Sequence, residues 1–184
     1  MTLNAESAQK ILIKNILIDP NLVLEEVKSL AKYHTLVGNL CLKGVLGKTL
    51  PSLEFLKIYG NLVIEDCNLL WNFPNLESVS GNVIVKNSQI TGFEDLSKIQ
   101  GDLKLKNSTI VHMHNLKTIS GNLVMDNSNL FHPLSLESIG KEIFMQESEI
   151  VHPMNLKFVN GKDYTGIKGA PITKTPEKTQ DLSL

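Results

Sequence analysis

Residues 116–125 read LKTISGNLVM, and residues 126–130 complete the motif with DNSNL. The same order of residue types returns every 20 residues, and the pattern LxxIxGNLxIxNSxI describes each copy. Its first position is occupied by Leu76, Leu96, Leu116, Leu136 and Leu156. A slightly longer copy begins at Phe55, and a looser one begins at Tyr33. Such repetition is the sequence signature of a repeat architecture.

Each copy predicts one strand with a buried face. Apolar residues alternate with other types, as at Leu103 and Leu105, which is typical of a strand with one side inward. A unit of 20 residues cannot bury its own apolar side chains, so neighbouring units must stack and share a core. We interpret the glycine before each strand, such as Gly101, as a position that needs a positive φ. The sequence therefore predicts a mainly β, single-domain β-solenoid with coils of about 20 residues.

Polar residues recur directly after each of these strands, at Asn87-Ser88 and Asn107-Ser108 for example. Since equivalent residues of stacked coils lie above one another, we expect them to form hydrogen-bonded ladders at a corner of the coil. Cys67 falls in the serine column and is predicted to be a small buried residue. Cys41 falls in a different column, so we do not expect the two cysteines to pair.

The repeats at 76–85 (LESVSGNVIV) and 116–125 resemble the receptor L-domain type of leucine-rich repeat. The resemblance extends from about residue 33 to residue 161. It implies a short right-handed, leucine-rich-repeat-like β-solenoid whose flat sheet commonly binds other proteins or ligands.

The two ends of the chain depart from the repeat. Apolar residues at helical spacing predict a first helix over residues 5–18, and Asp19-Pro20 predicts the start of a second. Residues 162–184 are rich in Thr, Lys, Pro and Gly. We therefore expect a helical N-terminal cap at 1–32, the repeat solenoid at 33–161 and a flexible C-terminal tail at 162–184.

Composition narrows the classes of partner. The 184 residues carry a net charge of −1, and all 18 basic residues are lysines. Arginine provides the bidentate fork that recognises phosphate and guanine, so we expect no nucleic-acid partner. No apolar run reaches the roughly 20 residues that cross a bilayer, so we expect no membrane partner. The first residues, 1–8, show no signal-peptide pattern, so we expect a cytoplasmic protein, with signal-independent export left open.

The outward positions of the predicted strands suggest a binding surface. The column between the inward pairs is mostly apolar and contains Cys41, Val63, Ile84, Lys104, Val124 and Phe144. An apolar stripe with a charged rim is typical of interaction surfaces. Strands favour β-branched residues in any case, however, and another part of the chain could cover the stripe. The predicted partner-binding residues are Val63, Ile84, Lys86, Lys104, Lys106, Val124, Asp126 and Phe144.

A histidine column is the second candidate. His112, His132 and His152 recur at the repeat period, and His114 is two residues from the first. Imidazole binds metals and titrates near neutral pH, so stacked histidines could form a metal site or a pH-sensitive edge. No Asp, Glu or Cys joins the column, however, and duplication alone accounts for a ladder of loop residues. We therefore predict no metal and no cofactor.

No catalytic motif is present: the chain lacks GxSxG, a P-loop, GxGxxG, HExxH and CxxC. Acids on the predicted sheet are interrupted by lysines rather than gathered on one patch, so we expect no enzyme activity. We expect a non-catalytic module that binds another protein through the exposed sheet, and analogy suggests a bacterial effector or immunity-type protein. A self-assembling scaffold is one alternative. A carbohydrate-binding or sugar-cleaving solenoid is another, disfavoured by the few outward aromatic residues, chiefly Tyr59 and Phe144.

Overall fold

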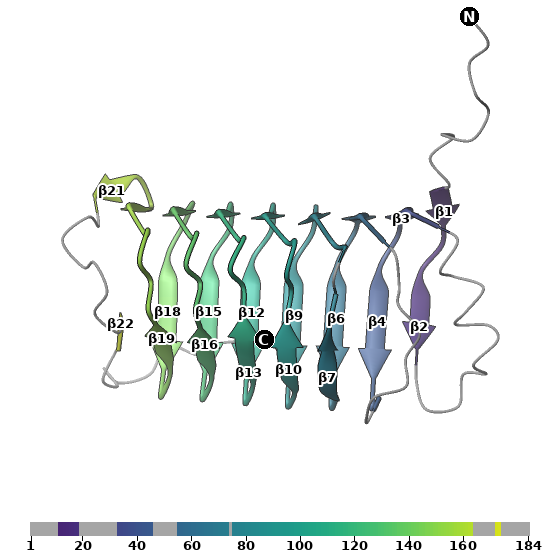
Figure 1. Cartoon of the computed structure of the whole chain (residues 1–184), viewed down its shortest axis with the longest axis horizontal. Coiled ribbons are helices and arrows are strands. Elements are labelled where there is room, and N and C mark those ends of the chain that lie inside the picture. Colours follow the sequence, from purple (N-terminus) through teal and green to yellow (C-terminus); the bar gives the residue numbers. More distant parts are fainter. Residues whose placement is uncertain (1–10, 19–32, 46–54, 74, 164–171, 174–184) are drawn as a thin grey trace, which may run out of the picture.

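The computed structural model describes residues 11–18, 33–45, 55–73, 75–163 and 172–173. In these residues the chain winds into a β-solenoid, and strands of successive coils lie side by side along its long axis (Figure 1). A full coil contributes one strand to each of three sheets. The predicted β-solenoid with coils of about 20 residues is therefore confirmed.

The three sheets, A, B and C, contain all the described strands. Sheet A has the order β1 (Ile11–Ile13), β3 (Thr35–Val37), β5 (Lys57–Tyr59), β8 (Ser78–Val79), β11 (Lys98–Ile99), β14 (Thr118–Ile119), β17 (Ser138–Ile139), β20 (Phe158–Val159) and β21 (Lys162–Asp163). Sheet B has the order β18 (Ile143–Gln146), β15 (Leu123–Asp126), β12 (Leu103–Lys106), β9 (Val83–Lys86), β6 (Leu62–Glu65), β4 (Leu40–Lys43) and β2 (Ile16–Ile18). Sheet C has the order β22 (Ile172–Thr173), β19 (Glu149–Val151), β16 (Asn129–Phe131), β13 (Thr109–His112), β10 (Gln89–Gly92) and β7 (Asn68–Asn72).

Equivalent positions of the repeat are stacked in register. Leu103 of β12 is the partner of Val83 on one side and of Leu123 on the other, and all three are completely buried. The inward residues of sheets A and C, such as Ile99 and Ile110, are also completely buried. One continuous apolar core therefore runs between the three sheets, as stacking of incomplete units requires.

Most of the glycines before the sheet B strands have a different role from the one predicted. Gly38, before β4, has the predicted positive φ, at 143°, but Gly81, Gly101 and Gly121 do not have one. A Cβ atom at Gly101 would instead lie 2.6 Å from the carbonyl carbon and oxygen of Gly81 and would also strike Oδ1 of Asn82. Glycine is thus required because adjacent coils approach too closely at this corner for any side chain. A regular series of positive φ values occurs instead at the corner after sheet B, where Asn87, Asn107 and Asn127 have φ of 46–47°.

Ladders of hydrogen bonds connect the coils at both corners of sheet B. One asparagine ladder and one serine ladder lie after sheet B, as predicted. There, Asn107 Nδ2 donates to Asn87 Oδ1 at 3.0 Å. The N–H of Ser88 donates to Oγ of Ser108 at 3.2 Å, and Oγ of Ser108 donates to the carbonyl of Lys106 at 2.6 Å. Cys67 lies in this serine column and is buried, also as predicted.

The other ladder lies before sheet B and was not foreseen. In it, a backbone N–H of each coil donates to the side chain of the preceding coil, as Asn82 does to Oδ1 of Asn61 at 2.7 Å. It runs from Asn15 to Glu142 without a break among the described residues.

The helix predicted over residues 5–18 is wrong for residues 11–18, which form β1 and β2. Their sequence, ILIKNILI, continues the strand pattern of the repeat, and Leu12 pairs with Leu36 while Ile16 pairs with Leu40. Isoleucine is β-branched and favours strands, and the open edge of the next coil supplies the hydrogen-bonding partners. The rest of the predicted cap, 1–10 and 19–32, lies outside the described residues. No described residue is helical, so the helical cap is not confirmed.

Beyond the last coil, two short strands run antiparallel to the solenoid. β21 pairs with β20, and β22 pairs with β19 through Ile172 and Ile150. The remainder of the predicted tail, 164–171 and 174–184, lies outside the described residues. These two strands occupy the C-terminal edges of sheets A and C.

We predict that Gly101→Ala destabilises the protein by about 1–3 kcal/mol, because the added methyl group is forced against backbone that cannot move without separating the coils. The free energy of urea unfolding measures this loss. Gly161→Ala is the control: nothing lies within 4 Å of its Cβ position, so only its φ of 70° opposes the change. A Gly101→Ala variant as stable as the wild type would contradict the role of close approach.

We also predict that Ser108→Ala costs about 1–3 kcal/mol in the same measurement, since it leaves the buried N–H of Ser88 without its acceptor. Ser97→Ala is the matched control. Its hydroxyl donates to the carbonyl of Glu77 in the preceding coil, at 3.1 Å, but at an exposed position. Equal losses in the free energy of unfolding for the two variants would show that the buried serine ladder stabilises the fold no more than an exposed hydrogen bond does.

Candidate functional site

The outer face of sheet B carries the column predicted from the sequence. Its side chains are partners across adjacent strands in the order Cys41, Val63, Ile84, Lys104, Val124 and Phe144. Most of them are half-buried, because strands about 4.8 Å apart make each side chain cover part of the next. Val124 is the most enclosed and is only 8% exposed.

The column continues onto one residue that the sequence analysis missed. Leu17 of β2 is the strand partner of Cys41 and is 54% exposed, the most exposed apolar side chain of the column. The helix predicted over this segment hid it. The strand pattern shared by ILIKNILI and the later repeats was the signal that could have revealed it.

The rim of the column consists largely of ion pairs. Lys43 is 3.4 Å from Glu65, Lys106 is 3.4 Å from Asp126, and Lys104 is 3.6 Å from Asp102. Glu65, Asp102 and Asp126 are therefore each held by a lysine and do not converge on a common point.

Lys86 is the exception in the rim. It lies between Glu65 and Lys106 in the strand register and makes no ion pair with any described residue. Its strand partner on β12 is another cation, Lys106, and Lys104 lies two residues before Lys106 on the same strand. Among the described residues, the centre of this face thus presents a lysine without an ion partner beside the apolar column.

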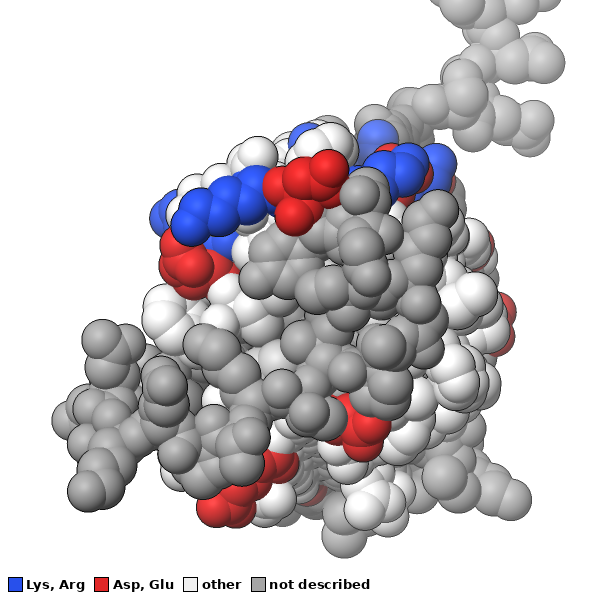
Figure 2. Space-filling view, turned by 90° about the vertical axis from the view of Figure 1, so that its left-hand side faces the viewer, with Lys and Arg blue, Asp and Glu red and all other residues white. Residues whose placement is uncertain are grey.

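The other two sheets have different outer faces. In the end view of Figure 2, charged side chains gather along the top, which is the side of sheet A in Figure 1. Sheet C has a half-buried apolar column of its own at Val111, Phe131 and Val151, which the sequence analysis did not single out. An apolar outer column is therefore not confined to sheet B.

The first coils also expose apolar residues on sheet A. Ile13, Val37 and Tyr59 are strand partners in successive coils, and Ile13 and Tyr59 are 76% and 53% exposed. The equivalent positions of later coils, Ser80 and Gln100 among them, carry no apolar side chain. This patch is restricted to the N-terminal end of the solenoid.

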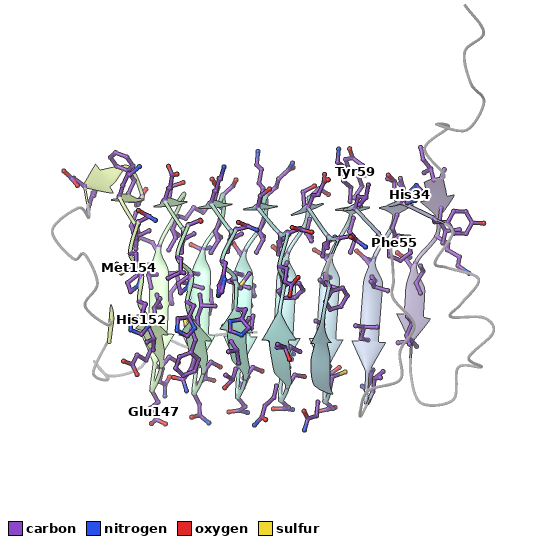
Figure 3. All side chains as sticks on the ribbon, viewed as in Figure 1. His34, Phe55, Tyr59, Glu147, His152 and Met154 are labelled. Atoms are coloured by element: carbon purple, nitrogen blue, oxygen red, sulfur yellow. The ribbon has the colours of Figure 1, made fainter. Side chains whose placement is uncertain are left out.

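The histidine column is formed as the repeat predicts. The rings of His132 and His152 are stacked with centroids 5.2 Å apart and an interplanar angle of 7°, and those of His112 and His132 are 5.9 Å apart at 24°. His152 lies in the turn after β19 (Figure 3). His132 and His152 adopt positive φ values of 49° and 60°. His114 also joins the group, with its ring edge-on to that of His112.

The two cysteines are free and do not pair, as expected. Burial raises the pKa of the Cys41 thiol, and the Glu65 carboxylate raises it further against a lowering by Lys43. Burial likewise raises the pKa of Cys67. Both thiols consequently need a higher pH to form the thiolate than in the unfolded chain.

Comparisons with protein-family models, curated proteins and solved structures found no match to this chain. Within the described residues, no helix is long and apolar enough to span a membrane.

We predict that iodoacetamide at about pH 8 labels Cys41 more slowly in the native protein than in urea, and labels Cys67 more slowly still. The thiolate is the reactive form, and the folded protein disfavours it at both positions. Mass spectrometry of the two cysteine peptides over time measures the rates. Native labelling of Cys41 at the unfolded rate would contradict the raised pKa.

Proposed function

We propose that the chain is a non-catalytic module that binds another protein through the outer face of sheet B. The observation that carries this proposal is the unbroken column from Leu17 to Phe144, in which mostly apolar, half-exposed side chains are stacked in register. At about 4.8 Å per strand, seven strands make a surface about 30 Å long. A partner that buries the column gains apolar contact along that whole length.

The rigidity of the face supports the proposal. Each side chain of the column already lies against its neighbours, so it loses little rotamer freedom on binding. The ladders on both corners of sheet B hold the backbone in place. Less of the free energy gained from contact is therefore lost in ordering the module when the partner binds.

The charges of the rim define the partner further. Lys86 has no ion partner among the described residues, and Lys104 and Lys106 lie on the adjacent strand. An acidic side chain beside an apolar ridge on the partner would pair with Lys86. Rim charges of this kind act mainly on specificity and association rate.

The motif LxxIxGNLxIxNSxI and the flat sheet B also support a relationship with the receptor L-domain type of leucine-rich repeat, which we include in the proposal. That likeness adds weight to a binding role for the sheet. The analogy with bacterial effector or immunity-type proteins rests on chain size and composition alone.

Self-assembly is the second candidate, favoured by the exposed Ile13, Val37 and Tyr59 at the N-terminal end. In that case copies of the chain would associate through this patch rather than bind a foreign partner. Light scattering over a concentration series separates the two, because only self-assembly raises the apparent mass of the purified chain.

We predict that Phe144→Asp and Ile84→Glu each reduce capture of the partner from a lysate of the source organism by at least about tenfold, since a charge interrupts the buried column. Both side chains lie on the outer face rather than in the core, so we expect the fold to be kept. Quantitative mass spectrometry of the captured proteins measures the effect.

Phe158→Asp is the matched control, because Phe158 is 48% exposed but belongs to sheet A. It should capture the same protein as the wild type. A partner lost with Phe158→Asp and kept with Phe144→Asp would move the binding surface away from sheet B.

A further inference from the structure

The turn that follows sheet C brings three histidines together. His112 ends β13, His114 lies in the following turn, and His132 follows β16 in the next coil. The turn is anchored from inside by Met113, which is completely buried, and by the carbonyl of His112, which accepts the N–H of Phe93 at 2.9 Å. The three imidazoles are thus held by the coil backbone rather than by loose loops.

The ring nitrogens converge. Nδ1 of His112 and Nε2 of His114 are 3.2 Å apart, and one nitrogen from each of the three rings lies within 4.8 Å of the others. Two ligands of a tetrahedral zinc ion, each about 2.0–2.1 Å from the metal, are separated by about 3.3 Å. The first pair already has this spacing. Rotation of the side chains about χ1 and χ2 can close the remaining difference.

The ring orientations also suit a common ligand. The His114 ring is nearly perpendicular to both others, at 81° to His112 and 83° to His132. Its lone pair therefore approaches from a different direction than theirs. His152, in contrast, is stacked parallel on the far side of His132 and does not belong to the group.

One buried atom of the cluster has no partner. Nδ1 of His132 is inaccessible to water and makes no hydrogen bond in the described part of the chain. A buried polar atom without a partner costs free energy. The described part of the fold therefore leaves this nitrogen atom of the cluster unsatisfied.

Duplication does not account for the cluster. The position two residues after His112, His132 and His152 holds His114, Leu134 and Met154 in turn, and Glu94 occupies it one coil earlier. Histidine occurs there only once, in the one coil where it can meet both His112 and His132. The third imidazole is thus a departure from the repeat.

We propose that His112, His114 and His132 bind a divalent transition-metal ion that prefers imidazole, such as Zn²⁺. Neutral imidazoles suit Zn²⁺, Cu²⁺ and Ni²⁺, whereas Mg²⁺ and Ca²⁺ require oxygen ligands. Three protein ligands leave the fourth tetrahedral position to water. This site lies beside sheet C and is independent of the binding surface proposed on sheet B.

The test uses the full chain, prepared without a histidine tag and stripped of metal with EDTA. Isothermal titration with Zn²⁺ should show saturable binding of one ion per chain, and Mg²⁺ should give no binding heat. Co²⁺ should produce the visible absorption of a tetrahedral complex. His114→Ala alters an exposed turn residue and should weaken Zn²⁺ binding by at least about tenfold.

His132→Asn and His152→Asn form a matched pair, because both positions have a left-handed φ that asparagine tolerates and only His132 belongs to the cluster. His132→Asn should lose binding, and His152→Asn should retain it. His34→Gln, at the other end of the solenoid (Figure 3), should bind as the wild type does. Absence of saturable Zn²⁺ binding, or equal binding by wild type and His114→Ala, would overturn the proposal, as would equal losses from His132→Asn and His152→Asn.

Discussion

The in-register stacking of the coils is the constraint on which the rest of the structure depends. Because equivalent residues are strand partners in adjacent coils, every position of the repeat becomes a column along the solenoid axis. A column works only if its residue type tolerates its own copy about 4.8 Å away. This condition accounts for the leucines inside, the asparagines and serines at the corners, and the glycines where backbones nearly touch. It also brings functional candidates together in lines rather than in pockets.

The periodic part of the fold could be predicted from the sequence because its physics is one-dimensional. The spacing of Leu76, Leu96 and Leu116 defines the coil length, and the alternation at Leu103 and Leu105 defines the inward face. The role of Gly101 could not be derived in the same way. Glycine serves both for positive φ and for close approach, and only the position of the neighbouring Gly81 backbone distinguishes the two. The segment 11–18 was misjudged for a related reason, since its apolar spacing fits a helix until the edge of the next coil is present.

The candidate sites were predictable to different degrees. The outer column of sheet B followed from alternation, except for Leu17, which was concealed by the helix prediction. The histidine column followed from the period, but its approach to His114 did not. His114 lies two residues after His112, and a side chain at that distance can point to either side of a turn. The backbone path of the turn determines which side it takes. The ring contacts at 81° and 83° are therefore structural information that the sequence pattern does not contain.

The asparagine ladder before sheet B has a consequence for how such a chain can change in length. The separation of its linked residues is 24 between Asn15 and Asn39, then 22, then 21, and thereafter 20. The rungs are nevertheless unbroken, so residues added between two rungs leave the rungs themselves intact. Adding a whole coil extends the ladder by one hydrogen bond. Adding residues within a coil lengthens the chain between two of these hydrogen bonds and leaves both in place. Such a molecule can lengthen within a coil and by whole coils separately, and neither change disturbs the other.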